Sequence, residues 1–311
     1  MIEGESVSGK IEDVSVDGMR TVSAKIENNT LNVELARQNA VDYLETTEES
    51  SLNSAKNVEK VFSDLDRKVA DGTATSKELA MGAAIQGMNA TTFATTTEKL
   101  SGEIYASSQA LTFAQAHNIN RNLSNHLSNI DNLKNSNKEW QTWMSAMGSN
   151  GKLSRSGYAS ADTHVSGGQI GIDKKINDTT QLGIALAYSY AHANFNRYAG
   201  DAKSDMIGIS LYGKKELGNE FYTMGRLGIS HISTRVKREL VDQNGDTVQG
   251  DINHRDYMTS LYVEAGKKIN WVTPFIGYSQ DYLRRGSFSE SNAAWGINAS
   301  SKNYHTSNFL I

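Results

Sequence analysis

The segment TQLGIALAYSYAHA, residues 180–193, alternates strictly between large and small side chains. One set of positions carries the large residues Leu182, Ile184, Leu186, Tyr188 and Tyr190. The other set carries the small residues Gly183, Ala185, Ala187, Ser189 and Ala191. A period of two is typical of a β-strand. A half-buried strand of a soluble sheet normally has polar residues on its outer face. This strand instead predicts a wall with an apolar outside and something packed close against its small-residue inside.

The sequence pattern divides the chain into three zones. Residues 1–45 alternate in short stretches separated by the turn-forming pairs Asp17-Gly18 and Asn28-Asn29, which predicts short strands. Residues 46–139 place apolar residues three or four apart, which predicts helices. From Trp140 to residue 311 the period is two again.

The last predicted helix, at about residues 98–136, is unusually rich in asparagine in its second half. Asparagine is a mediocre helix former, and a surface helix of a soluble protein more commonly carries Glu and Lys. A polar helix that runs through a polar lumen accounts for this composition. A plain linker helix on a protein surface is the alternative.

Eight strands are predicted in the third zone, at 140–148, 162–176, 180–193, 204–217, 220–235, 254–269, 271–285 and about 298–311. The joins at 177–179, 218–219 and Asn270 are very short. The joins at 149–161, 194–203, 236–253 and 286–297 are long and polar. Short turns at one end and long loops at the other are the pattern of an outer-membrane β-barrel.

The strands are long enough for a bilayer. Fourteen residues span roughly 45 Å, or roughly 35 Å in height when the strand is tilted by about 40°. The alternation predicts a lipid-facing set consisting of Leu182, Ile184, Leu186, Ile209 and Leu211. It predicts a lumen-facing set consisting of Asp173, Gly183, Ala185, Ala187, Arg226, Glu264 and Lys268. Charges belong on the inside because a basic residue that faces lipid costs about 2–4 kcal/mol at mid-bilayer.

The composition narrows the function. The net charge is −4 with mixed signs, so no nucleic-acid partner is expected. No apolar run is long enough for a membrane-spanning helix. Cysteine is absent, and the seven histidines form no metal-ligand or catalytic spacing. We therefore expect no enzyme activity, no metal and no cofactor. The start MIEGESVSGK is not a signal peptide, which we interpret as a cytosolic chain or a fragment.

Several ordered segments resemble the C-terminal translocator of classical autotransporters. KLSGEIYASSQA at 99–110 is similar to the pre-barrel segment of that family, and EWQTWMSAMG at 139–148 is similar to its first strand. VSGGQIGIDKKIN at 165–177 and TQLGIALAYSYA resemble the next two strands. GISLYGKKELGNEFYTMGRLGIS at 208–230 resembles the hairpin that follows. Residues 1–45 look like the β-helical end of a passenger.

This resemblance implies a twelve-stranded antiparallel barrel with a helix through it, in the outer membrane of a Gram-negative bacterium. Residues 1–45 would end the passenger, 46–139 would be a helical linker, and 140–311 would be an incomplete barrel. The chain would be a fragment truncated at both ends. Its partners would be outer-membrane lipid, its own upstream passenger, the barrel-assembly machinery and periplasmic chaperones. The self-cleaving Asn-Asn pair of some relatives is not carried over, because the only such pair here is at 28–29.

Two other functions remain open from the sequence. One is a small eight-stranded outer-membrane barrel that acts as an adhesin or a structural anchor. Its interior would be just filled by side chains and would leave no room for a helix. The other is a soluble antiparallel barrel or sandwich that acts as a cytosolic binding protein.

Overall fold

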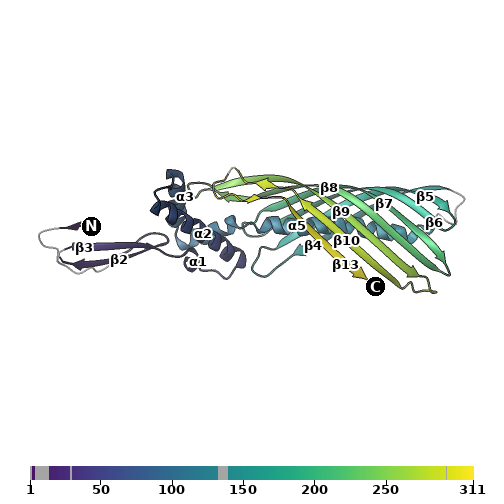
Figure 1. Ribbon diagram of the computed structural model, residues 1–311, viewed down its shortest axis with the longest axis horizontal. Helices are drawn as coiled ribbons and strands as arrows, with labels where there is room; N and C mark the ends of the chain where they lie inside the picture. The colour runs from purple at the N-terminus through teal and green to yellow at the C-terminus, as the bar shows by residue number, and fades with distance from the viewer. Residues whose placement is uncertain (1, 4–13, 29, 132–138, 292) are drawn as a thin grey trace.

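The protein is an elongated molecule with a small hairpin at one end, a group of helices in the middle and a large curved sheet (Figure 1). The structure is a computed structural model, and it describes residues 2–3, 14–28, 30–131, 139–291 and 293–311. Mainly antiparallel β-structure preceded by helices was expected, and this fold class is confirmed.

The N-terminal strands form a small antiparallel sheet. Strands β1 (Ile2–Glu3), β2 (Arg20–Glu27) and β3 (Thr30–Arg37) lie in the order β1-β3-β2. The hairpin of β2 and β3 runs in register from Glu27 opposite Thr30 to Arg20 opposite Arg37. These strands therefore differ from the expected β-helical stem, because a β-helix stacks parallel strands.

Four helices follow the hairpin: α1 (Ala40–Tyr43), α2 (Glu49–Ala70), α3 (Ser76–Gln86) and α4 (Ala90–Leu100). Their core contains the fully buried side chains of Phe62, Ile85 and Phe93. An ion pair between Arg37 and Glu59 ties the hairpin to α2, with 2.7 Å between Nη1 and Oε2. Burial alone would raise the pKa of Glu59, but hydrogen bonds from Arg37 and the Ala40 amide outweigh it, and the pKa lies below its ordinary value.

The large sheet contains all eight strands that the sequence predicts. They are β4 (Trp140–Leu153), β5 (Ala161–Asn177), β6 (Thr180–Phe195), β7 (Asp201–Gly218), β8 (Phe221–Val241), β9 (Thr247–Lys267), β10 (Phe275–Arg285) and β13 (Lys302–Leu310). Their order in the sheet is β13-β10-β9-β8-β7-β6-β5-β4, so each strand is hydrogen-bonded to its neighbour in the chain apart from the short hairpin between β10 and β13.

Several strands extend well beyond the predicted boundaries at the loop end of the sheet. The predicted loop at 236–253 shrinks to residues 242–246, and that at 194–203 shrinks to residues 196–200. The extensions form because Val236, Leu240 and Ala202 are buried on the inner face at this end. The alternation there was hidden by polar residues on the outer face.

Two predicted connections have different structures. The turn predicted at Asn270 spans residues 268–274, because Ile269 and Val272 form an isolated bridge and β10 begins only at Phe275. The predicted loop at 286–297 is not wholly irregular. It contains strand β11 (Phe288–Ser289), which pairs with β12 (Asn298–Ala299) to form a small hairpin. The last strand accordingly begins at Lys302 rather than at residue 298.

The predicted helix at about 98–136 is divided in two. Helix α4 ends at Leu100, and α5 (Glu103–Asn129) begins after Ser101 and Gly102. A Cβ on Gly102 would come within 2.6 Å of the Ile297 side chain, so the break allows the close approach of the β11–β12 hairpin. The part of the prediction at 132–136 lies outside the described residues. No helix in the described part of the chain is long and apolar enough to cross a bilayer.

Candidate functional site

The candidate site is the concave face of the large sheet together with helix α5, which lies along it (Figure 1). Residues of the predicted lumen-facing set are buried on this face: Asp173, Gly183, Ala185, Ala187, Arg226 and Glu264. Lys268, just beyond the end of β9, is partly exposed. The predicted lipid-facing residues Leu182, Ile184, Leu186, Ile209 and Leu211 are 39–60% exposed on the opposite face.

Helix α5 is hydrogen-bonded to strands across the whole width of the sheet. The Gln115 amide donates to the backbone oxygens of Ser189 on β6 and Ser204 on β7, each at 3.1 Å. At the two edges, Asn118 donates to Ser149 on β4 and Gln109 donates to Tyr304 on β13. A helix that merely linked two domains would not make contacts to both edges of the sheet.

The interface between the helix and the wall is more apolar than the sequence suggested. Ile119, Leu123 and Leu127 are buried against the wall, whereas Asn125 and Asn129 are exposed. The expected asparagines do meet the wall, because Asn118, Asn120 and Asn122 hydrogen-bond to its strands, but leucine and isoleucine share that side of the helix with them.

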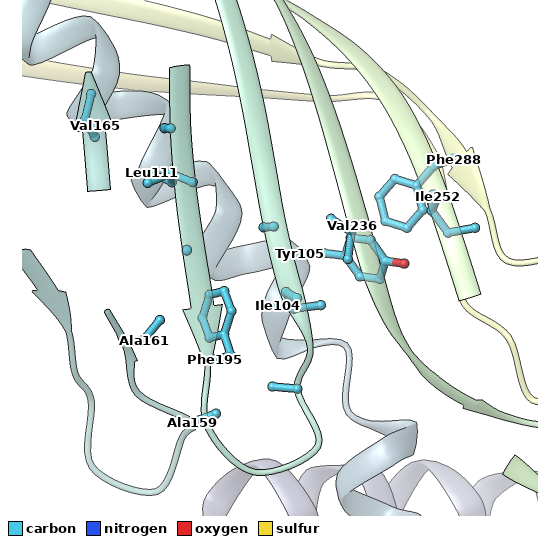
Figure 2. Close-up of a cluster of buried hydrophobic side chains, with 14 residues drawn as sticks. Ile104, Tyr105, Leu111, Ala159, Ala161, Val165, Phe195, Val236, Ile252 and Phe288 are labelled. Atoms are coloured by element: carbon cyan, nitrogen blue, oxygen red, sulfur yellow. The ribbon is translucent and has the colours of Figure 1, made fainter. Parts of the chain in front are cut away.

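At the loop end, the start of α5 is held in an apolar cluster. Ile104, Tyr105 and Leu111 of α5 pack with Val236, Ile252 and Phe288 from the inner face of β8, β9 and β11 (Figure 2). The Tyr105 and Phe288 rings stack with 4.2 Å between their centroids. The helix is thus packed at its N-terminal end as well as along its length.

Next to this cluster lies a buried ion pair that the sequence did not indicate. The Arg238 guanidinium donates to both carboxylate oxygens of Glu290, at 2.6 and 2.7 Å, and both side chains are at most 2% exposed. Arg238 also donates to the backbone oxygens of Lys99 and Ser101, and the Tyr105 hydroxyl donates to Glu290. The ion pair therefore joins β8, the β11–β12 hairpin and the α4–α5 junction.

At the turn end, Asp173 anchors the other half of α5. His126 of the helix lies 2.9 Å from one Asp173 oxygen, and the Tyr212 hydroxyl donates to the other at 2.6 Å. The His126 ring stacks on Trp143 with 4.0 Å between centroids. Gly183 makes this arrangement possible, because a Cβ there would come within 2.4 Å of the Tyr212 ring.

The other predicted charged residues of the lumen have different partners. Arg226 donates to the Asn120 backbone oxygen and the Ser124 hydroxyl of α5. Glu264 is held by the hydroxyls of Tyr222 and Tyr262 on the wall itself. Lys268 and Lys214 both donate to Asp131, just after α5, and no pattern in the sequence pointed to this residue.

Replacing Ala185 by tryptophan should prevent the sheet and α5 from packing together. Ala185 is 3% exposed and lies in one cluster with Leu123 and Leu127, so the larger ring would overpack a filled space at a cost of about 1–3 kcal/mol or more. The folded fraction after refolding in detergent, read by gel mobility without heating, measures this loss. Ile184→Trp is the matched control, because Ile184 is 43% exposed on the other face. Equal folded fractions for the two variants would contradict close packing at this position.

No cluster of potential metal ligands is present among the residues that the structure describes. The site instead combines an apolar outer face, a buried inner face and a helix fixed at both ends.

Comparison with known proteins finds autotransporters at the level of the family model, of individual sequences and of a solved structure. The sequence matches the family model "Autotransporter beta-domain" over residues 142–309. The chain is 26% identical over 176 residues to the IgA-specific serine endopeptidase autotransporter of Neisseria gonorrhoeae and 24% identical over 188 residues to an immunoglobulin A1 protease autotransporter of Haemophilus influenzae. These matches cover 57% and 58% of this chain, which spans about a tenth of each relative.

A solved structure is similar as well. The translocator domain of the autotransporter NalP from Neisseria meningitidis matches with a TM-score of 0.51 and 16% sequence identity. The match covers 63% of this chain and 68% of that domain. At this identity the similarity concerns the fold.

Proposed function

The chain belongs to the autotransporter β-domain family, and we propose that it anchors in the bacterial outer membrane and exports a passenger that precedes it to the cell surface. The family is that of outer-membrane β-barrels of type V secretion. The single observation that supports translocation in this chain is the position of α5. A polypeptide segment directly before the first strand runs along the inner face from the loop end to the turn end.

The proposal assigns a different role to each of three segments of the chain. Residues 140–311 are the barrel wall, residues 46–139 include the lumen helix, and residues 1–45 are the end of the passenger. Helices α1–α4 support this division, because they lie at the loop end, where Glu48 and Glu98 pair with Arg197 of the β6–β7 loop. A passenger attached there would lie outside the loops.

The β-domain of this family is a non-enzymatic barrel, and we propose that this chain carries no catalytic site of its own. The relatives are named as proteases, so a catalytic passenger is the expected kind of cargo, but its activity would reside in residues that precede this chain. We further propose that the barrel-assembly machinery and periplasmic chaperones are its partners during insertion, because long amphipathic strands expose both faces before the sheet is complete.

An eight-stranded anchor or adhesin is the weaker alternative. A closed barrel of eight strands has an interior that side chains just fill. Helix α5, whose own diameter with side chains is about 10 Å, would have no space in it. The helix on the concave face therefore favours the translocator.

Site-directed spin labelling tests which face of the wall contacts lipid. The chain has no cysteine, so Ile184→Cys and Ala185→Cys each provide one attachment point. In the membrane-inserted protein we expect the label at 184 to be relaxed by a lipid-soluble agent and the label at 185 to be protected. A lipid-exposed label at 185 together with a protected label at 184 would reverse the facing of the strand and contradict the proposal.

A further inference from the structure

The outer face of the sheet carries a row of three lysines at the turn end. They are Lys174 on β5, Lys215 on β7 and Lys267 on β9. Lys174 and Lys215 directly follow Asp173 and Lys214, which are buried on the inner face. Because side chains alternate along a strand, the lysines point outward. Each follows exposed apolar residues of its strand, such as Ile172 on β5, Leu211 on β7 and Val263 on β9, and only Ile176 on β5 and Leu217 on β7 continue the apolar face beyond them toward the turn.

Strand register places these lysines at one height. Lys174 is opposite Leu182, which is in turn opposite Gly213, two residues before Lys215. Lys215 is opposite Thr223, which is two residues from Phe221, the partner of Lys267. The lysines occupy every second strand, and neighbouring strands are about 4.8 Å apart, so the backbone positions of neighbouring lysines are roughly 10 Å apart across the strands.

Aromatic rings accompany two of the three lysines in the same geometry. The Lys174 ammonium lies 4.8 Å above the Trp140 ring, and the Lys267 ammonium lies 4.8 Å above the Phe221 ring. In each case the two residues are directly opposite on adjacent strands. Trp140 and Phe221 are about half exposed on the outer face, and Trp271 in the next turn is 93% exposed. We call these six residues the lysine–aromatic collar.

The collar lysines differ from the other lysines nearby in their charge partners. On the inner side, Lys214 and Lys268 are both neutralised by Asp131, and Lys175 pairs with Asp178. Within the described residues, none of the three collar ammonium groups has a carboxylate within ion-pair distance. Their charge is therefore available to a ligand that approaches from outside the wall.

We propose that the collar binds the phosphate groups of anionic glycerophospholipids in the leaflet at the turn end of the sheet. The apolar outer face would place the collar at the depth of the lipid headgroups, where aromatic rings are favoured and lysine stems lie along apolar surface. An ammonium group binds phosphate oxygen as a point charge. A zwitterionic headgroup carries its own ammonium, which competes for the same phosphate, so a net-negative lipid is preferred. This inference rests on the proposed membrane location.

Native mass spectrometry of the protein released from nanodiscs tests the preference directly. The discs contain equal amounts of phosphatidylcholine and phosphatidylglycerol, and the lipids that remain bound are counted. We expect phosphatidylglycerol to be retained in excess over phosphatidylcholine. The variant Lys174→Gln/Lys215→Gln/Lys267→Gln should lose this excess, because glutamine keeps a polar side chain of similar size without the charge.

The matched control removes three positive charges from the outer face at the loop end, as Lys203→Gln/Lys237→Gln/Arg255→Gln, and should keep the excess. The proposal is overturned if the collar variant keeps it, if the control loses as much, or if inorganic phosphate displaces the lipid as effectively as free phosphatidylglycerol does. Insertion into pure phosphatidylcholine, measured by flotation and by heat-modifiable gel mobility, tests the membrane function separately from lipid binding at the collar. A protein that does not insert there contradicts the membrane function, whereas one that inserts without lipid preference contradicts only the collar.

Discussion

A protein that lacks residues 1–130 should conduct ions in planar bilayers, whereas the protein with these residues should stay close to the bilayer baseline. The deletion removes α5, which lies along the concave face from Glu103 at the loop end to Asn129 near the turn end. A helix with its side chains is about 10 Å wide, so its removal leaves a water-filled column of about that width. Single-channel recording measures the change.

The control for this deletion removes residues 1–97 and keeps α5. It should retain the low conductance, because Gln115, Asn120 and His126 still bind the wall. Both proteins must first show heat-modifiable gel mobility, so that the conductance is compared only between folded proteins. If the deletion of 1–130 folds and yet its conductance stays at the baseline, α5 does not close the lumen. The helical segment would then be a linker, and the eight-stranded anchor would be favoured.

The wall was largely predictable from the sequence because one rule holds for every strand of a membrane-type sheet: side chains alternate between the outer, apolar face and the inner face. Ala185 and Ile184 could be assigned to opposite faces from period alone, and their burial differs as that rule requires. The same rule would have extended β8, since Arg238 has the parity of Arg226 and follows the buried Val236. The predicted strand ends at residue 235 because the stretch 236–253 is polar, as is typical of a loop.

The contacts between the helix and the wall were not predictable from one sequence. Nothing in the spacing links Asp131 to Lys214 and Lys268, or Glu290 to Arg238, because these pairs are set by the register of the helix in the sheet. The asparagine-rich composition drew attention to the helix. It did not show which side faces the wall, since asparagines lie both against the wall, as Asn118 does, and on the exposed side, as Asn125 does.

Breaking the buried ion pair at the loop end should destabilise the folded protein strongly. Arg238→Met leaves the Glu290 carboxylate, whose side chain is 0% exposed, without its cation. Removing one partner of a buried pair typically costs about 3–5 kcal/mol, because the remaining charge is uncompensated. The variant also leaves the Lys99 and Ser101 backbone oxygens without their donor, so the α4–α5 junction should loosen first. The temperature at which the heat-modifiable band is lost measures the effect.

Arg235→Met is the matched control, since Arg235 lies on the same strand and pairs with Asp251, but on the exposed face with both side chains 41–51% accessible. An exposed pair contributes only about 0–1 kcal/mol, so this variant should denature close to the wild-type temperature. Arg238→Lys separates charge from geometry, because lysine keeps the positive charge but cannot donate in parallel to both carboxylate oxygens and to two carbonyls. The temperature at which Arg238→Lys loses its heat-modifiable band should lie between the temperatures for the wild type and Arg238→Met. If Arg238→Met costs no more than Arg235→Met, the buried pair does not hold the helix junction, and the apolar cluster around Tyr105 and Phe288 must do so alone.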